Sequence, residues 1–238
     1  MKIATWNLDY CRADGIREQM ASVGADIWVL TETLPTCSPG KEYLLVACSP
    51  PHNCRTDKPD ARFVAIWIRD ALQVASWTAE ERRVLPVHEQ RMACIRMTHP
   101  EQDDIVVVGT VLPYPGDPLY GSGDAGYCAA LASQSVEWEY LRGGQHSDLC
   151  VAGDFNQSLP YVRYFGSRSR AKALKEAIES LKLSSVTENA DNLGDPYIDH
   201  IFISKAFQRV GSLNCWPKGK YGTCSTDHAG VCADLTRT

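Results

Sequence analysis

Short apolar runs alternate along the chain with stretches in which apolar residues recur at helical spacing. The apolar runs predict strands at residues 3–6, 26–31, 43–46, 63–68, 93–97, 105–111, 149–152, 198–203 and 229–235. The helical spacing predicts helices at residues 16–23, 125–141 and 169–183. Asp14 is placed to cap the first helix, Gly24 to end it, and Ser169 to cap the last one. The strand–helix–strand opening indicates an α/β protein, as does the nearly unbroken apolar run 105–111, which is typical of a strand buried on both faces.

Polar residues lie at the ends of several predicted strands. Asn7, Glu32 and Asp154 each close a strand, and Asp227 lies just before the last one. We expect these side chains to share one edge of the sheets, where functional sites usually lie. The sequence contains no internal repeat, low-complexity tract or linker, so residues 1–238 are interpreted as one domain.

The polar groups at these strand ends suit phosphate-ester hydrolysis. That reaction needs a carboxylate to hold a divalent cation, an imidazole and a carboxylate to manage the protons of a water, and an amide to meet developing charge. Taken singly, an Asn or Asp at a strand end is more often an ordinary turn residue. Their occurrence together indicates a metal-dependent phosphohydrolase. His200 is interpreted differently, as a packed or hydrogen-bonded neighbour of Asp199.

Four segments carry these residues in order: Thr5-Trp6-Asn7, Thr31-Glu32-Thr33, Gly153-Asp154-Phe155-Asn156, and the pair Asp199-His200 followed by Asp227-His228. Together they resemble the endonuclease/exonuclease/phosphatase superfamily, which includes deoxyribonuclease-I-like nucleases. The resemblance spans residues 3–235. It implies a four-layer α/β/β/α sandwich of two mixed sheets flanked by helices, and it implies a phosphoric ester hydrolase that depends on Mg²⁺ or Mn²⁺.

The resemblance also implies roles for individual residues. Glu32, Asn7 and Asp227 would hold the cation, since hard oxygen ligands suit Mg²⁺ or Mn²⁺ better than zinc. His228 would be the catalytic imidazole, and Asp199 would hold it in orientation and tautomer.

The remaining roles fall to the Gly153–Asn156 segment. Asp154 would orient or deprotonate the attacking water, and Asn156 would donate to a phosphate oxygen as negative charge builds there. Whether Asp154 or His228 is the base stays open at this stage. Many relatives carry a Tyr or His just after the strand that ends here at residues 109–110. In this chain Val111 takes that place, and Tyr114 either reaches back from the following loop or the contact is missing.

Basic residues interleaved with aromatic ones follow the Asn156 segment and favour a nucleic-acid substrate. The candidate substrate-binding cations are Arg163, Arg168 and Arg170, joined by Lys172, Lys175, Lys218 and Lys220. Several of them surround the first turn of the predicted helix 169–183, where a helix N-terminus can bind an anion. The alternative is a solvated basic helix end.

The first hypothesis is therefore a nuclease or nucleic-acid phosphodiesterase acting on DNA or RNA. A phosphatase or phosphodiesterase of a small soluble ester is the rival, because the loop 113–126 could shape a small-molecule pocket. The third hypothesis is a catalytically silent binding module of the same fold.

Composition and charge bear on the binding partners, the location and the state of the cysteines. A net charge of −5 argues against a protein that coats nucleic acid with its whole surface. No apolar run is long enough to cross a bilayer, and no feature indicates an obligate protein partner. The ten cysteines are irregularly spaced and are interpreted as reduced thiols of a cytoplasmic protein. A zinc site built from Cys37, Cys48, His52 and Cys54 is the less favoured interpretation of that segment.

Overall fold

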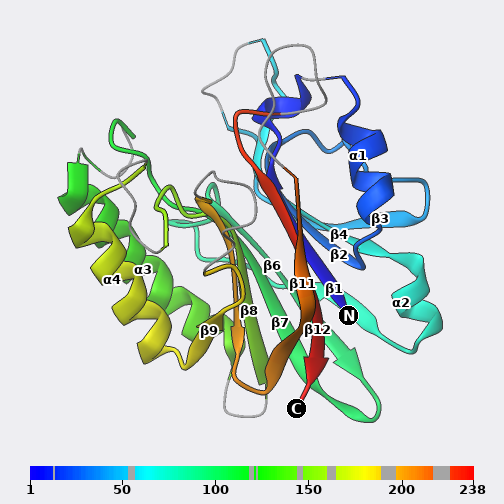
Figure 1. The fold of residues 1–238 in the computed structure, drawn as a ribbon. Helices are drawn as coiled ribbons and strands as arrows, with labels where there is room; N and C mark the ends of the chain where they lie inside the picture. The colour runs from blue at the N-terminus through cyan, green and yellow to red at the C-terminus, as the bar shows by residue number, and fades with distance from the viewer. Residues whose placement is uncertain are drawn as a thin grey trace.

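The computed structural model describes residues 1–12, 14–52, 57–117, 121, 123–143, 147–159, 165–188, 197–216 and 226–238. In this part of the chain two mixed sheets of six strands pack face to face, and helices cover their outer sides (Figure 1). The predicted α/β/β/α sandwich is confirmed. Among the described helices, none combines the length and the apolar character needed to traverse a lipid bilayer.

The first sheet has the strand order β11-β12-β1-β2-β4-β3. Its strands are β1 (Lys2–Asn7), β2 (Ile27–Thr33), β3 (Tyr43–Cys48), β4 (Arg62–Arg69), β11 (Phe207–Trp216) and β12 (Gly230–Arg237). β1 runs parallel to β2 and antiparallel to β12, so the two ends of the chain lie close together (Figure 1). This arrangement also brings the residues just before β12 next to the end of β1.

The second sheet has the strand order β5-β6-β7-β8-β10-β9. Its strands are β5 (Thr78–Glu81), β6 (Met92–His99), β7 (Gln102–Val111), β8 (Ser147–Asp154), β9 (Leu183–Ser185) and β10 (Asp199–Ser204). β7 and β8 are parallel, and β10 returns antiparallel to β8. The first residue of β10 therefore lies opposite the last residue of β8.

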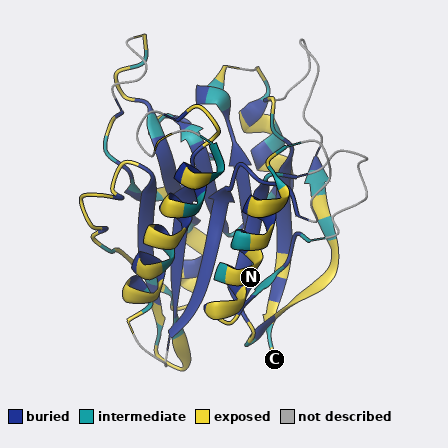
Figure 2. Cartoon of the chain, turned by 90° about the vertical axis from the view of Figure 1, so that its left-hand side faces the viewer, coloured by how far each residue is buried: buried dark blue, intermediate teal, exposed yellow. Residues whose placement is uncertain are grey.

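Helices lie on both sides of the sandwich. They are α1 (Ile16–Val23), α2 (Asp70–Val74), α3 (Gly123–Arg142) and α4 (Arg168–Ser180), with a 3₁₀ turn η1 at Asp9–Cys11. α3 and α4 cover the second sheet, presenting exposed residues outward over buried strands (Figure 2). α1 packs Ile16, Met20 and Val23 against the outer face of the first sheet.

Residues 105–111 of β7 are nearly all apolar, and the packing on both faces of the strand explains this. Ile105, Val107 and Val111 face the core between the two sheets. Val106 and Val108 face the opposite way, into the core beneath α3 and α4. Because side chains alternate across a strand and both faces are covered, residues 105–111 are nearly all apolar, and the hydroxyl of buried Thr110 is satisfied by donating to Gln134 Oε1.

The apolar pattern does not predict α2, β5, β9, β11 or the 3₁₀ turn η1. β11 is a sheet-edge strand whose residues are mostly exposed, and its pairing with β12 is interrupted between Val210 and Asn214. Two predicted caps are wrong. Gly15, with a φ of 79°, precedes α1 in place of Asp14. Ser167 caps α4 by accepting a hydrogen bond from the Arg170 amide, two residues before the predicted Ser169.

Candidate active site

The candidate site lies where the ends of strands from both sheets meet. Asp199, the first residue of β10, pairs in register with Asp154, the last residue of β8. Asn7, the last residue of β1 in the other sheet, donates from Nδ2 to Asp154 Oδ2 at 3.2 Å. The two sheets are therefore joined by a direct polar contact at this edge, as the positions of the polar residues in the sequence predict.

His228 belongs to the loop before β12 and contacts Asp199. Its Nδ1 lies 2.6 Å from Asp199 Oδ2, and the side chains are 11% and 1% exposed, respectively. Burial alone lowers the pKa of His228, but the carboxylates of Asp199 and Asp154 outweigh that effect and raise it above its usual value. The pair therefore favours an imidazolium that donates its Nδ1 proton to Asp199.

Asp154 is buried and accepts three hydrogen bonds. Besides Asn7, its donors are the Asn156 amide N–H at 2.8 Å and Asn156 Nδ2 at 3.2 Å. Burial raises the pKa of Asp154, the charge of Asp199 adds to the rise, and His228 opposes it. A carboxylate with a raised pKa is a stronger base than an ordinary aspartate, so Asp154 can take a proton from water.

Asn156 is held in an uncommon conformation. Its φ of 47° lies in the left-handed region, which asparagine tolerates better than most residues. Asn156 Nδ2 donates to the Leu112 carbonyl at 2.9 Å as well as to Asp154, so both hydrogens of the amide are engaged. Asn156 therefore orients Asp154 in this arrangement, and donation to a phosphate oxygen would require it to release one of these contacts.

Gly153 allows β8 to bring Asp154 close to the end of β7. Its φ is 142°, and a Cβ at this position would lie 2.0 Å from the backbone oxygen of Thr110. Any larger residue would therefore have to move one of the two strands. This close approach explains why a glycine opens the Gly153–Asn156 segment.

Glu32 and Asn7 come from adjacent parallel strands. Glu32 is partly buried with a φ of 42°, and burial raises the pKa of its carboxyl, with a further contribution from Asp154. Asn7 Oδ1 accepts the Asp9 amide N–H at 3.0 Å, which fixes the orientation of the side-chain amide. Its nitrogen, rather than the predicted oxygen ligand, therefore faces the carboxylates.

The acidic groups fit a divalent cation. Ligand atoms of Asp154, Asp199 and His228 lie within 4.8 Å of one another, and because a protonated His228 binds no metal, the donors at this edge are the carboxylates. Burial raises the pKa of Asp199, and the charges of Asp227 and Glu32 contribute to the rise. Asp199 Oδ1 is buried and accepts no hydrogen bond within the described part of the chain. Hard carboxylate oxygens that repel one another are the donor set that Mg²⁺ or Mn²⁺ neutralises.

Asp227 and Tyr114 are the most exposed of the predicted site residues that are described near these strand ends. Asp227 lies on the surface next to His228 and interacts electrostatically with Glu32 and Asp199. Tyr114 is 48% exposed in the loop after β7, and its ring lies against Gly116. The position paired with Asp154 on β7 is held by Val111, whose side chain points into the core between the sheets. Within this pairing no tyrosine or histidine takes the place that the resemblance leads one to expect.

The predicted anion site at the start of α4 is already filled. The Asp124 carboxylate accepts hydrogen bonds from the hydroxyls of Ser167 and Ser169 and from Arg170 Nε, the last at 2.7 Å. The Arg170 side chain is 2% exposed and lies over the Tyr127 ring at 5.0 Å. The structure therefore contradicts the prediction that Arg170 binds substrate, because its guanidinium is buried and neutralised by the Asp124 carboxylate of α3.

The other predicted cations give a mixed result. Arg168 is exposed at the first residue of α4 and remains a candidate. Lys172 and Lys175 are exposed but pair with Glu176 and Glu188. Arg163, Lys218 and Lys220 lie outside the described residues.

A disulfide joins the loops that follow β1 and β2. Cys11 and Cys37 are bonded, with Cα atoms 6.8 Å apart. The expectation of reduced thiols is therefore wrong for this pair, and Cys37 is not available for the zinc site that was considered. The pairing could not be read from spacing, because it depends on β1 and β2 being neighbours in the sheet.

Thr226 supports the site although the sequence pattern assigns it no role. Its Oγ1 accepts the His228 amide N–H at 3.0 Å and donates to the His228 carbonyl at 3.0 Å. A threonine two residues before a loop histidine is a recognisable signal for such a turn.

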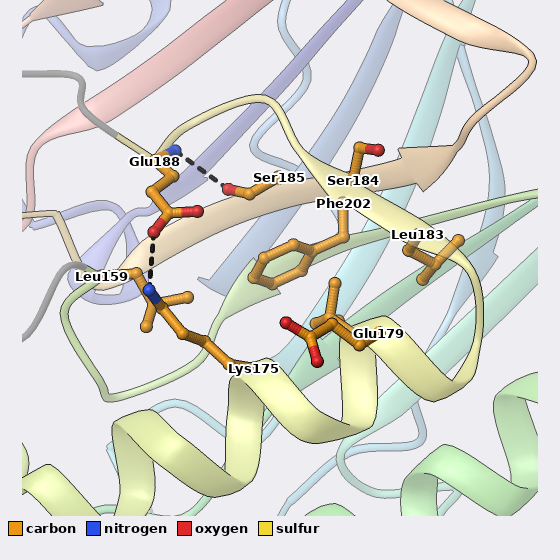
Figure 3. A pocket seen from close by; sticks show the side chains of 9 residues that line it. Leu159, Lys175, Glu179, Leu183, Ser184, Ser185, Glu188 and Phe202 are labelled. Atoms are coloured by element: carbon orange, nitrogen blue, oxygen red, sulfur yellow. Dashed lines mark hydrogen bonds and ion pairs between the residues drawn. The ribbon is translucent and has the colours of Figure 1, made fainter.

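A pocket of about 350 Å³ opens on the helical side of the second sheet, away from this chemistry. It lies between α4 and strands β9 and β10, with Phe202 at its floor and the Lys175–Glu188 ion pair at its rim (Figure 3). Of the predicted site residues, Lys175 alone lines it, and the residues of the strand-end cluster do not. We therefore assign the candidate site from the strand-end cluster rather than from the pocket.

Comparisons with known proteins agree with the geometry. Three similar solved structures each align with nearly the whole of both chains. An AP endonuclease from Archaeoglobus fulgidus aligns at 16% identity and a TM-score of 0.66, covering 98% of each chain. A mannosyl-6-phosphatase from Bacteroides thetaiotaomicron aligns at 14% identity and a TM-score of 0.65, covering 99% of each chain. TDP2 from D. rerio, in complex with a single-strand DNA product, aligns at 14% identity and a TM-score of 0.63, covering 99% of this chain and 98% of that one.

At these identities the structural similarities show a shared fold. Comparison with curated protein sequences gives no match. The model of the Endonuclease/Exonuclease/phosphatase family, however, matches residues 4–228. That span contains all of the strand-end residues described above, and the chain belongs to this family of phosphoester hydrolases.

Proposed function

We propose that the protein hydrolyses a phosphodiester with the help of Mg²⁺ or Mn²⁺, and that its substrate is DNA or RNA. The observation that carries this proposal is the buried Asp199–His228 pair, with its 2.6 Å contact, placed opposite Asp154. The same edge presents Glu32 and Asp227, the proposed cation ligands. A nucleic-acid substrate is supported by relatives that are an AP endonuclease and a DNA-bound TDP2.

In the proposed chemistry Asp154 and His228 have different roles, which are set by their surroundings. Asp154 removes a proton from the attacking water, because its raised pKa strengthens it as a base and Asn7 and Asn156 fix its direction. His228, kept protonated by Asp199, donates a hydrogen bond to the phosphate as negative charge develops. A divalent cation bound by Glu32 and Asp227 would polarise the phosphoryl group and stabilise the leaving oxygen.

A small soluble phosphate ester is the second candidate substrate, and one observation favours it. Arg170 and the start of α4 do not offer the expected phosphate contacts, because Asp124 occupies them. A mannosyl-6-phosphatase also shares the fold over the whole chain. A silent binding module is disfavoured by the close contact between His228 and Asp199.

The test measures hydrolysis of bis-p-nitrophenyl phosphate, of labelled single- and double-stranded DNA and RNA, and of a panel of sugar phosphates. Each substrate is tried with EDTA, Mg²⁺ and Mn²⁺, using the wild type, His228→Ala and His99→Ala. His99 is the matched control, because it lies at the far end of β6 and packs on Trp77 at 5.1 Å. His228→Ala should lower turnover by about 10²–10⁴-fold, the usual range for an acid–base group, and His99→Ala should not.

Each outcome decides between the hypotheses. Metal-dependent cutting of DNA or RNA that disappears in His228→Ala supports the nuclease proposal. Hydrolysis of sugar phosphates alone supports the second candidate. Metal binding without turnover on any substrate would leave the binding module, and equal turnover in wild type and His228→Ala would remove His228 from the mechanism.

A further inference from the structure

The indole of Trp6 contacts the backbone of the proposed catalytic histidine. Trp6 Nε1 donates to the His228 carbonyl oxygen at 3.2 Å, although the two residues are 222 positions apart in the sequence. Trp6 is fully buried, so its N–H has no access to bulk water and needs a partner inside the protein. The carbonyl of His228 is that partner.

The position of the Trp6 ring is itself fixed by the surrounding packing. Its centroid lies 5.4 Å from that of Trp216, with the two planes at 85°. Trp216 in turn lies against Gly230 of β12, where a Cβ would come within 2.1 Å of its ring. The absence of a side chain at Gly230 therefore lets Trp216 pack down on β12 and support the edge of Trp6.

Three polar contacts thus hold the backbone on either side of the imidazole. Thr226 Oγ1 accepts the N–H of His228, and both Thr226 Oγ1 and Trp6 Nε1 donate to its carbonyl oxygen. We infer that Trp6 and Thr226 are positioning residues, which hold the backbone of His228 where its imidazole contacts Asp199. This inference rests on the proposed function, because it assigns Trp6 and Thr226 a role only through His228.

β1 organises both proposed catalytic groups from consecutive positions. Successive side chains of a strand point to opposite faces, so Trp6 reaches the His228 loop while Asn7 reaches Asp154 at 3.2 Å. The segment Thr5-Trp6-Asn7 therefore combines a contact to the proposed base, Asp154, with a contact to the loop of His228, the proposed hydrogen-bond donor to the phosphate. A displacement of about 1 Å at either group is enough to lower catalysis by about a hundredfold.

The variant that tests this inference is Trp6→Phe, which keeps an aromatic ring and removes the indole N–H. The matched control is Trp28→Phe, because Trp28 is equally buried and its ring lies 5.8 Å from the same Trp216. Trp6→Phe should lower kcat on bis-p-nitrophenyl phosphate by about ten- to a hundredfold and leave KM within about twofold. Trp28→Phe should leave both constants near the wild-type values.

A double-mutant comparison separates a positioning role from a structural one. If Trp6 acts through His228, Trp6→Phe should lower kcat in the wild type and have no further effect in the His228→Ala protein. A second readout does not depend on activity. The proton between His228 Nδ1 and Asp199 should give a downfield NMR resonance in the metal-free wild type and in Trp28→Phe, and it should be lost or broadened in Trp6→Phe.

Several results would overturn the inference. They are equal kcat values for Trp6→Phe and Trp28→Phe, an equal loss with and without His228, and an unchanged downfield resonance. If Trp6→Phe does not fold, Thr226→Val provides the same test, since it removes the hydroxyl that holds the His228 N–H. Failure of the proposed function is recognised separately, because His228→Ala would then retain full turnover.

Discussion

His200 offers a quantitative test of how the site is supported. The residue is fully buried on β10, one position after Asp199. Its Nε2 donates to the Gln157 carbonyl at 2.8 Å, and its Nδ1 accepts from the Thr187 hydroxyl at 3.0 Å. This arrangement satisfies a neutral imidazole on both sides and leaves no place for a second proton. The interpretation of His200 as a packed or hydrogen-bonded neighbour of Asp199 is confirmed, and its hydrogen bonds go to Gln157 and Thr187.

Protonation of His200 should therefore cost folding free energy. Burial lowers the pKa of His200 from 6.5 to about 4, opposed by its bond to Gln157. Because the folded-state pKa is lower than the unfolded one, the stabilisation is complete above pH 6.5 and is lost as the pH falls towards 4. With these two pKa values, the loss between pH 7.5 and pH 5 is about 2 kcal/mol.

The measurement is urea unfolding of the wild type and His200→Gln between pH 7.5 and pH 5, with EDTA present throughout. Glutamine does not titrate, so the variant should lack this part of the pH dependence even if its stability is lower overall. The difference between the two free energies of unfolding should therefore change by about 2 kcal/mol across the range. His99→Gln, at a partly exposed position on β6, is the control. Parallel pH profiles for the wild type and His200→Gln would refute the reasoning.

Two further predictions concern the end of β2 and the disulfide that joins the loops after β1 and β2. Glu32→Gln should lower activity, and a higher concentration of Mg²⁺ or Mn²⁺ should partly restore it. The control Glu42→Gln, at an exposed position, should behave as wild type. Activity that is independent of metal in all three proteins would remove Glu32 from the cation site. Reduction of Cys11–Cys37, which are 26 residues apart, should lower the free energy of unfolding by about 3.5 kcal/mol on the loop-entropy model. Urea unfolding with and without dithiothreitol measures this effect, and Cys37→Ser should not respond to the reductant; a wild type that is equally insensitive would contradict the prediction.

The sequence predicts the parts of this molecule that depend on local pattern. The run 105–111 is recognisable because β7 is buried on both faces, whereas β11 is missed because an exposed edge strand carries little apolar signal. Residues at strand ends are found for the same reason, since the end of each apolar run marks the sheet edge. The errors arise where the outcome depends on partners distant in sequence. Arg170 looks free until Asp124, 46 residues earlier, is placed beside it. The Cys11–Cys37 bond likewise depends on which loops meet.

The charge of the site links its proposed metal requirement to its proposed substrate. Four carboxyls, those of Glu32, Asp154, Asp199 and Asp227, interact around the single imidazole of His228. Such a cluster repels the anionic phosphate of any substrate, and the net charge of −5 adds no attraction from the rest of the protein. One imidazolium does not balance these carboxyl groups, even with the raised pKa of Asp154, so we expect the approach of a phosphodiester to need further positive charge at this edge. Arg170 is already paired and Arg168 is one exposed candidate, and a divalent cation is the further source that the donor set itself favours. Electrostatics therefore supports the proposed metal dependence in addition to family membership.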